Sequence, residues 1–309
     1  MGMVVIGAVF VDIKGYPTSA FIPTGRNAGR VEQIHGGVGR NVAEDIANCE
    51  LRPTFVSLVD DSGTGVDVVR KLKSHRVNTD YIRKTRNGME HGWRSSTTTG
   101  TWRRPSPSGR TCCPLPTRWS RTATRFSKTR TASSSRSTWT RRSSSAPSGW
   151  RRSMESCLCV VANMSIALER RDFLQSTDCF VCNQQEAGIL FSDDYSGKTP
   201  EEMIPIISAK VQAARIPAMI VTMGADGAVY ANLHGESGYC PARKLEVKDT
   251  TGAGDAFCAG AAIGLTYGKG LKEACEIGAM LAASVIVTSE SVCPRFRPRE
   301  LGLDMDVED

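Results

Sequence analysis

The sequence contains no uninterrupted apolar run of about 18 residues, the length that a membrane-spanning helix requires. Its first residues, MGMVVIGAVFVDIKG, lack both a positively charged start and a long apolar stretch, so they do not have the pattern of a secretory signal. Together these absences predict a cytoplasmic protein that has no membrane partner.

Potential metal ligands are few or poorly spaced. The chain has only four histidines, and its eleven cysteines are scattered. The single CxxC pair, Cys179 and Cys182, lies inside an apolar strand pattern and has no second pair at the spacing of a zinc ribbon. We therefore expect buried free thiols. His35, beside a glycine turn, could approach a substrate, but the sequence shows no partner that would orient it, which favours a structural or solvent-facing role.

Negative charge is absent from the middle of the chain. From Arg94 to Ser153, a window of 60 residues, there is no Asp, Glu, Val or Ile, whereas 13 Arg, 15 Ser and 12 Thr make up 40 of the 60 residues. With Lys128 the window carries 14 positive charges, so the formal net charge of +7 leaves 7 − 14 = −7 for the rest of the chain. Such a window can bury almost no aliphatic surface to offset the chain entropy lost on ordering.

Two interpretations of this window compete. One is a disordered basic segment that binds nucleic acid, with Arg contacting phosphates and the five tryptophans in or beside the window stacking on bases. The other, which we favour, is translation in the wrong reading frame. With permitted GC-rich codons for Glu90 to Thr140, reading two nucleotides later gives one open frame containing ARLAVFDNNGDV, VAAAVSKRPDLLPL and ALEQNGDEIFKDADCIILEIDMD. These peptides have strand alternation, turn signals and carboxylates. We expect residues 90–157 as written to be poorly ordered and turnover to be low.

The rest of the chain alternates between strand and helix patterns. Strand patterns occupy Val4–Val9, Thr54–Leu58 and Ala218–Thr222, and helix patterns occupy Val38–Cys49, Gly65–Ser74, Pro200–Ala214 and Leu271–Val287. This alternation predicts an α/β fold with a mostly parallel sheet and helices on both faces, in one domain spanning 1–309. Ligands then bind at the carboxyl ends of the strands.

The motif DTTGAGDAF carries the most chemical information. Gly252, Ala253 and Gly254 are small enough for consecutive backbone N–H groups to converge on one anion, and the apolar run Ala256–Leu265 continues as a helix whose N-terminus favours negative charge. Asp255 lies in the first turn of that helix, where a carboxylate can accept the proton of an attacking hydroxyl. A helix cap after a glycine turn is the structural alternative. The full string is more specific than that and predicts phosphoryl transfer.

DTTGAGDAF resembles the C-terminal signature of the ribokinase-like (PfkB-type) sugar and nucleoside kinases, and other parts of their pattern follow in order. HGGVGRNVAEDIA is similar to the family's glycine-glycine motif, in which a turn at Gly36 and Gly37 opens a helix containing Asn41. Upstream, VVIGAVFVD predicts a buried strand followed by Asp12. The resemblance implies that Asp12 and Asn41 hydrogen-bond acceptor hydroxyls, although each could instead cap a local turn or helix. Phe10 departs from the polar residue of many members.

Two later motifs are also similar to the family. In CFVCNQQEAG, Asn183 and Glu186 match an Asn-x-x-Glu element that helps to organise magnesium and phosphate. VTMGADGAVY predicts a strand, a tight turn and a second strand. The resemblance assigns Thr222, Gly224 and Gly227 of that segment to the nucleotide, while an ordinary glycine hairpin is the alternative.

A monovalent-cation site is implied by the same resemblance. Asp249 and Thr251 match positions that hold a cation such as K⁺ in many relatives, and the rest of the site would fall within Thr288 to Cys293.

The resemblance covers about Val4–Gly88 and Val160–Arg299. It implies a three-layer sandwich with a small β lid, whose first part is residues 11–35 and whose second part coincides with the anomalous segment. The implied activity is ATP- and Mg²⁺-dependent phosphorylation of a hydroxymethyl group on a sugar or nucleoside, with Asp255 as base. The string GGVGRN is most similar to the pseudouridine kinase branch. Lid-mediated dimers occur in relatives, so the resemblance also allows a homodimer.

Two functions of other classes stay open. A nucleic-acid-binding protein would act through the basic window, and its binding would be sensitive to salt. A regulatory protein would bind ATP and magnesium without transferring phosphate to any acceptor.

Overall fold

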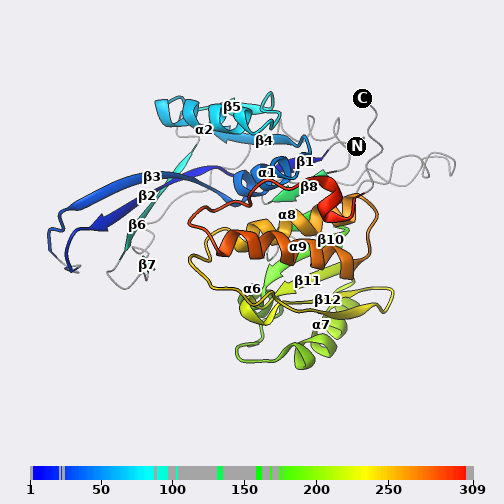
Figure 1. The fold of residues 1–309 in the computed structure, drawn as a ribbon. Coiled ribbons are helices and arrows are strands. Elements are labelled where there is room, and N and C mark those ends of the chain that lie inside the picture. The colour runs from blue at the N-terminus through cyan, green and yellow to red at the C-terminus, as the bar shows by residue number, and fades with distance from the viewer. Residues whose placement is uncertain are drawn as a thin grey trace.

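Two β-sheets, the larger one covered by helices, make up the fold in the computed structural model (Figure 1). The structure describes residues 3–86 apart from 21, 23 and 24, together with residues 89–96, 102–103, 131–134, 158–161, 168, 174–175 and 177–303. Most of the segment predicted to be out of frame and poorly ordered, residues 90–157, lies outside the described residues, so that prediction is not tested here.

The larger sheet has nine strands and is mostly parallel. In spatial order the strands are β13 (Ser237–Cys240), β12 (Ala228–Asn232), β11 (Ala218–Thr222), β10 (Cys179–Asn183), β9 (Leu158–Val161), β8 (Thr131–Ser134), β1 (Val4–Ile6), β4 (Thr54–Val59) and β5 (Ile82–Lys84). Neighbours from β11 to β5 run parallel, whereas β12 and β13 add an antiparallel edge. This topology confirms the predicted α/β class.

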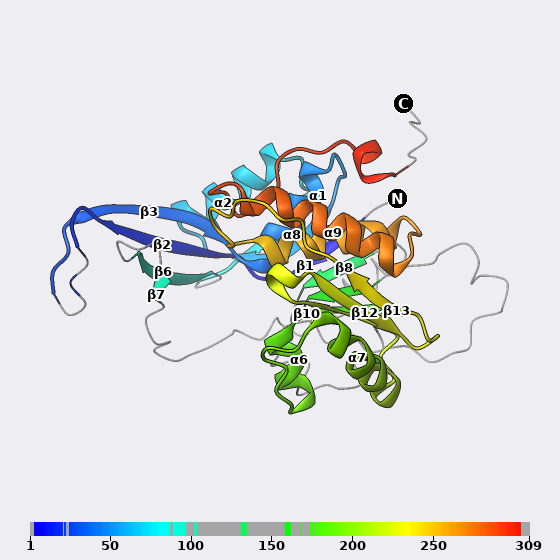
Figure 2. The same ribbon diagram turned by 60° about the horizontal axis from the view of Figure 1, so that its bottom comes forward.

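Helices cover both faces of this sheet. On one face lie α1 (Val38–Asn48), α2 (Gly63–Ser74), α8 (Ala253–Thr266) and α9 (Leu271–Ile286), and on the other lie α6 (Gln184–Phe191) and α7 (Pro200–Ala214) (Figures 1 and 2). Strand residues alternate between the two cores: Val181 and Ile220 pack with the first group, and Phe180 and Met219 with the second. The helices on both faces match the sequence-based expectation.

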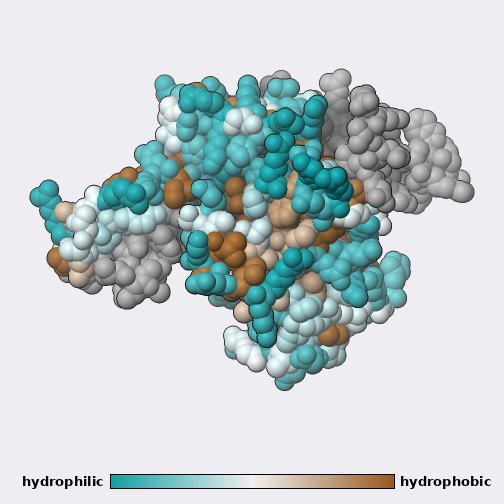
Figure 3. Space-filling view, viewed as in Figure 1, coloured by the Kyte–Doolittle hydropathy of each residue, from teal (hydrophilic) through white to brown (hydrophobic). Residues whose placement is uncertain are grey.

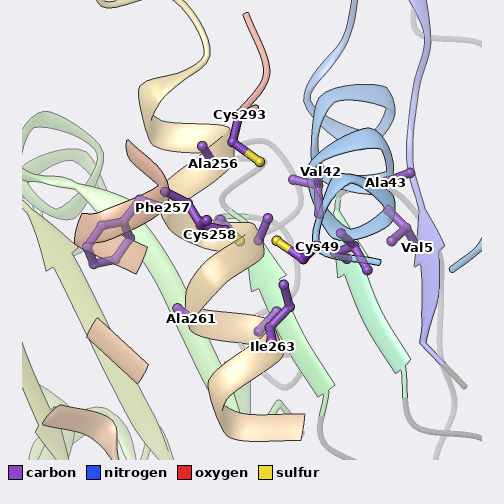
Figure 4. Close-up of a cluster of buried hydrophobic side chains, with 14 of the residues drawn as sticks. Val5, Val42, Ala43, Cys49, Ala256, Phe257, Cys258, Ala261, Ile263 and Cys293 are labelled. Carbon is purple, nitrogen blue, oxygen red and sulfur yellow. The ribbon is translucent and has the colours of Figure 1, made fainter. Parts of the chain in front are cut away.

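Thiols form part of the core between α1 and α8 (Figure 4). Cys49, Cys258 and Cys293 lie there among aliphatic and aromatic side chains. The cysteines whose side chains the structure describes are buried, as predicted, and none of them forms a disulfide with another described cysteine. Cys179 and Cys182 pack into the cores on opposite faces of β10, so they do not converge on one ion. The described residues contain no cluster of three or more His, Cys, Asp or Glu that could hold a metal.

The smaller sheet extends away from the body (Figures 1 and 2). Its strands are, in order, β3 (Gly29–Gly36), β2 (Phe10–Pro17), β6 (Glu90–Ser96) and β7 (Trp102–Arg103). β2 and β3 pair antiparallel over their full lengths, from Phe10 opposite Gly36 to Pro17 opposite Gly29. This ribbon occupies the residues predicted as the first part of a lid, and its action as a lid stays a prediction.

The strand predicted at Val4–Val9 is wrong in length. β1 ends at Ile6 because the chain leaves the larger sheet at Gly7, whose carbonyl accepts a hydrogen bond from Ser57 Oγ at 2.7 Å, and the chain then enters β2. Asp12 therefore lies inside β2 and not in a turn after a strand. The other predicted elements occur close to their expected bounds, with the turn between β11 and β12 formed by a short 3₁₀ helix, η1 (Gly224–Asp226).

Local capping fixes several of the helix starts. Ser62 accepts a hydrogen bond from Gly65 N at 3.3 Å, which starts α2 two residues before the predicted Gly65. α7 begins with a capping box, in which Thr199 Oγ1 accepts from Glu202 N and Glu202 accepts from Thr199 N. A second 3₁₀ helix, η2 (Pro298–Leu301), lies near the end of the described chain.

The described surface is mixed in polarity. Hydrophilic residues cover most of the face in Figure 3, and hydrophobic residues form small separate patches. Within the ranges that the structure describes, no helix has the length and apolar character needed to span a bilayer.

Candidate active site

The anion hole predicted at Gly252, Ala253 and Gly254 falls at the N-terminus of α8. Gly252 is its N-cap and has φ 87°, a left-handed conformation that favours glycine. A Cβ on Gly252 would lie 2.0 Å from the Ser291 carbonyl oxygen, so this turn packs directly against the segment after α9. A Cβ on Gly254 would meet nothing within 4 Å. The backbone at Gly254 is therefore open to a ligand at a helix N-terminus, where negative charge is stabilised.

Asp255 lies in the first turn of α8 and is partly buried. Its Oδ2 accepts a hydrogen bond of 2.6 Å from Asn41 Nδ2 on α1. Burial raises the pKa of Asp255 from 3.8 to about 6, while the Asn41 hydrogen bond and the Arg40 charge act to lower it and Glu186 acts to raise it. The carboxylate is thus ionised at neutral pH and has a pKa close to that of an effective general base.

The predicted acceptor residues surround the start of α1. Gly37 is the N-cap with φ 108°, and a Cβ there would lie 2.6 Å from the Ala8 carbonyl oxygen. Gly36 ends β3, and a Cβ on it would come within 3.0 Å of Asp12 Oδ2. Asp12, 8% exposed, therefore lies against the glycine turn, and its contact with an acceptor stays a prediction.

α1 is also joined to the segment that follows α9. Arg40 is buried, binds Glu44 and the His35 carbonyl, and donates to Ser291 Oγ at 3.3 Å. Asn48 Nδ2 donates to the Cys293 carbonyl at 2.7 Å. Since the Ser291 carbonyl packs against Gly252, these bonds connect α1 to the N-terminus of α8.

One cavity of about 1010 Å³ brings most of the predicted residues together. It lies between the small sheet, the N-terminal ends of α1 and α8, and α2. The predicted residues on its lining are Asp12, Gly36, Gly37, Asn41, Asn183, Asp249, Thr251, Gly252, Gly254 and Asp255. Ala253 and Glu186 are next to lining residues without lining the cavity themselves.

The predicted nucleotide residues lie outside this lining. Thr222 ends β11, is paired in register with Asn183 on β10, and directs Oγ1 towards the Cys182 carbonyl at 3.4 Å. Gly227 has φ 96°, and a Cβ there would lie 2.2 Å from the Cys240 carbonyl oxygen. Gly224, with φ 61°, opens η1. Backbone geometry alone accounts for both glycines, so their contact with a nucleotide stays a prediction.

Asn183 and Glu186 form the N-terminal cap of α6. Asn183 Oδ1 accepts from Glu186 N at 2.8 Å, and Glu186 Oε2 accepts from Asn183 N at 2.9 Å. Burial raises the pKa of Glu186, and its cap hydrogen bond opposes that rise. The cap uses Oε2 and leaves Oε1 without a hydrogen bond to any residue that the structure describes.

The predicted cation residues lie beside the anion hole. Asp249 Oδ1 accepts from Thr251 N at 2.9 Å, which orders the turn before Gly252. Of the segment Thr288–Cys293, residues Ser289, Glu290 and Ser291 line the same cavity, whereas Cys293 is buried on the side that faces α1.

Sequence reasoning missed three residues on the inner face of the small sheet. Tyr16 lies opposite Arg30 in the β2–β3 register, with the Arg30 guanidinium carbon 5.0 Å from the centre of the Tyr16 ring. Arg30 also pairs with Glu32 at 3.1 Å, and the Glu32 carboxylate hydrogen-bonds Tyr16. This Tyr16–Arg30–Glu32 cluster lines the cavity. Strand periodicity could have placed the three on one face, but not that face against the site.

His35 also has a partner that the sequence did not reveal. Its Nε2 lies 3.2 Å from Asp67 Oδ2 on α2, and both residues line the cavity. Burial lowers the pKa of His35, and the Arg40 charge acts in the same direction. Asp67 is therefore a partner that can orient His35. The sequence did not reveal this partner, and for that reason it favoured a structural or solvent-facing role for His35.

The site brings together the open N-terminus of α8, the Asp255 carboxylate and the glycine turn before α1, and the sequence model of the pfkB family of carbohydrate kinases matches residues 2–98 and 152–295. The chain belongs to this family. The internal part of this pfkB-family kinase that the match omits, residues 99–151, lies within the segment predicted to be out of frame.

The chain is also similar to individual members of the family. This pfkB-family kinase is 30% identical over 295 residues to the guanosine-inosine kinase of Exiguobacterium acetylicum, which covers 93% of this chain and 95% of that protein. It is 23% identical over 299 residues to the pseudouridine kinase of Escherichia coli K12, with 84% and 82% covered. The ribokinase of Arabidopsis thaliana, solved with ribose and ATP, has the same fold with a TM-score of 0.76, 18% identity and 98% and 99% coverage.

Proposed function

We propose that this protein transfers the γ-phosphoryl group of ATP to the hydroxymethyl group of a nucleoside. The observation that carries the proposal is the 2.6 Å hydrogen bond between Asn41 and Asp255. It joins the helix expected to hold the acceptor to the helix whose N-terminus is expected to bind the transferred group. A hydroxyl bound beside Asn41 is then within reach of both a proton acceptor and an anion hole.

The chemical roles follow from these positions. Asp255 accepts the proton of the attacking hydroxyl, and the backbone N–H groups of Gly252, Ala253 and Gly254 stabilise the negative charge on the phosphoryl group. Asp12 and Asn41 hold hydroxyls of the acceptor sugar. In this proposal Thr222, Gly224 and Gly227 contact the nucleotide further from the reacting atoms.

The residues fit a magnesium ion that arrives with the nucleotide. Because the described residues contain no three-ligand metal cluster, the phosphates would have to supply part of the coordination, which is the usual arrangement for Mg²⁺. Asn183 and Glu186 would hold the ion, which neutralises phosphate charge when bound. Asp249 and Thr251, with Ser289 or Ser291, would hold a monovalent cation such as K⁺.

The Tyr16–Arg30–Glu32 cluster favours a nucleoside over a free sugar. An aromatic ring can stack on a nucleobase, a guanidinium can donate to its carbonyl and ring nitrogen, and a carboxylate can accept from ring N–H and amino groups. Guanine and hypoxanthine offer O6 and N7 as acceptors and N1–H as a donor. Guanosine and inosine are therefore our first candidates, in agreement with the names of the substrates of the relative from Exiguobacterium acetylicum.

Pseudouridine is the second candidate, because its kinase in Escherichia coli is also a relative and because of the GGVGRN string. The test is a panel of guanosine, inosine, pseudouridine, adenosine and ribose with ATP and Mg²⁺, in which ADP release is measured and the product is identified by mass spectrometry. We expect the highest kcat/KM for guanosine or inosine. A preference for ribose would overturn the nucleoside assignment, and ATP binding without turnover of any acceptor would indicate a regulatory protein.

A variant of the cluster sharpens this test. Glu32→Gln should raise KM for guanosine by about tenfold, since a hydrogen bond to a charged group contributes about 1.5–3 kcal/mol, and should leave KM for ribose unchanged. The exposed Glu246→Gln is the matched control, because it removes the same charge outside the cavity. Equal effects of Glu32→Gln on guanosine and ribose would exclude a role in reading the base.

A further inference from the structure

α1 carries a second buried carboxyl one helical turn after Asn41. Asp45 is 0% exposed, and its position four residues after Asn41 places both side chains on the same side of α1, facing α8. Its Oδ1 accepts a hydrogen bond of 2.6 Å from Cys293 N, and its backbone carbonyl lies 3.7 Å from Cys293 Sγ. The carboxyl therefore joins the acceptor helix to the segment that packs against the anion hole.

Two buried oxygens on this side of α1 have no hydrogen-bond partner among the described residues. They are Asp45 Oδ2 and Asn41 Oδ1. With Asp45 ionised, both atoms would be unsatisfied acceptors and one would carry an unpaired buried charge, which is costly. With Oδ2 protonated, the charge disappears and Oδ2 becomes a donor one helical turn from the Asn41 oxygen. A single proton on Asp45 Oδ2, donated to Asn41 Oδ1, would satisfy both atoms.

Among the described residues, no positively charged group faces Asp45 to compensate a negative charge on it. The ionisable groups that face it are Asp255 and Cys258 from α8, and Cys293 from the segment after α9. On its own helix, the Arg40 guanidinium is engaged with Glu44, the His35 carbonyl and Ser291. Figure 4 shows the thiols and apolar side chains that fill the space between α1 and α8. Burial raises the pKa of Asp45 well above its ordinary value, and the neighbouring Cys293 and Asp255 act in the same direction.

The direction of the Asn41 amide matters for the reaction, because its Nδ2 donates to Asp255. If the amide were reversed, its oxygen would face the Asp255 carboxylate and the donor would be lost. A donor on the opposite side of the amide, at Oδ1, excludes that reversal.

We propose that Asp45 is a positioning residue that remains a neutral carboxylic acid, donates its proton to Asn41 Oδ1 and thereby directs the Asn41 amide at the Asp255 carboxylate. This inference rests on the proposed role of Asp255 as the base, but its central claim, the neutral state of Asp45, concerns folding and can be measured without any acceptor.

The first test compares the natural chain with Asp45→Asn by urea unfolding between pH 4 and pH 8.5. An amide of the same shape keeps one donor and one acceptor and cannot ionise. The folded-state pKa of Asp45 is raised. The contribution of the neutral Asp45 carboxyl to the stability of the natural chain is therefore fully present below the ordinary pKa of an aspartate and is lost as the pH rises. Asp45→Asn should therefore be the more stable protein at pH 8, and its advantage should disappear towards pH 4. A less stable Asp45→Asn at pH 8 would overturn the proposal.

The second test asks whether Asp45 orients Asn41. Asp45→Asn should keep kcat within about threefold, whereas Asp45→Ala, which has no donor, should lose at least tenfold in kcat and shift the acidic limb of the pH–rate profile to higher pH. The shift is expected because the Asn41 hydrogen bond lowers the pKa of Asp255. An unshifted limb in Asp45→Ala, or an equal loss in both variants, would contradict positioning.

Failure of the proposed function is separable from failure of this inference. If no acceptor is phosphorylated, the pKa of Asp255 can be followed by carboxyl ¹³C NMR in the same two variants, with the same expected shift in Asp45→Ala. If Asp45→Ala does not fold, the pH dependence of the stability of Asp45→Asn decides the neutral state on its own.

Discussion

Replacing Asp255 by Asn should inactivate the enzyme and stabilise its fold at the same time. The carboxylate is ionised at neutral pH although it is partly buried, and this burial raises its pKa from 3.8 to about 6. At 1.36 kcal/mol for each pKa unit, that rise corresponds to about 3 kcal/mol by which the ionised group destabilises the folded state. An amide of the same shape removes this cost and can still accept the hydrogen bond from Asn41.

The direction of the pKa shift determines how the difference in free energy of unfolding depends on pH. Because the folded-state pKa is raised, the favourable contribution of the neutral acid is fully present below pH 3.8 and is lost as pH rises through about 6. Asp255→Asn should therefore exceed the natural chain by up to about 3 kcal/mol in free energy of unfolding at pH 8, and by nothing near pH 3.8. Urea unfolding at a series of pH values measures this difference.

Activity should change in the opposite direction. Loss of a general base lowers kcat by roughly 100- to 10,000-fold, while ATP binding, measured by calorimetry, should change little. The natural enzyme should show an acidic limb in kcat/KM near pH 6. The exposed Asp61→Asn is the matched control and should alter neither quantity. Full turnover by Asp255→Asn, or a destabilised variant at pH 8, would refute the assignment of this residue.

Two further predictions concern the anion hole and the anomalous window. Gly252→Ala should destabilise the fold by well over 1 kcal/mol and abolish turnover, because the new Cβ meets both a left-handed φ and a collision with Ser291. Gly268 is the control, since it has φ 79° and nothing near the position of a Cβ. Gly268→Ala should show only the backbone cost of about 1 kcal/mol in the same unfolding assay. Tryptic mass spectrometry of the protein from its natural source, between Arg86 and Arg170, should give the acidic peptides of the shifted frame. The peptide TASSSR, Thr131–Arg136, would instead establish the basic window as real.

Local signals in the sequence were sufficient for most of the elements near the site. α7 has the bounds predicted for it because Thr199, Pro200 and Glu202 start it by capping, and β11 has the bounds predicted from its apolar run. The predicted strand at Val4–Val9 was too long, because hydrophobicity continues from β1 into β2 although the chain changes sheets at Gly7.

Which residues form the site could be predicted only in part, from the family resemblance, because the remaining residues are brought there by packing. Asn41 and Asp255 are 214 positions apart, and no local pattern predicts their hydrogen bond. The pair of His35 with Asp67 and the Tyr16–Arg30–Glu32 cluster were not predicted, because a periodic pattern gives the face of an element and not the surface that this face contacts. At Gly227 the sequence pattern suggested contact with a ligand, but packing alone explains the residue, because a Cβ there would collide with the Cys240 carbonyl oxygen.

Because α1 is bonded to the segment after α9, substitutions on the small sheet and substitutions between α1 and α8 are expected to have different effects. Arg40 and Asn48 on α1 bind that segment, and Ser291 on it packs against Gly252, so α1 and the N-terminus of α8 are held together by bonds of which only the one from Arg40 to the His35 carbonyl involves the small sheet. Substitutions on β2 and β3 other than at Asp12, His35 and Gly36 are then expected to alter which acceptor binds and to leave the arrangement of Asn41 and Asp255 unchanged. A family that uses one phosphoryl-transfer apparatus for sugars and nucleosides alike needs such a division, and exchanging the small sheet between relatives is the corresponding route to new acceptors.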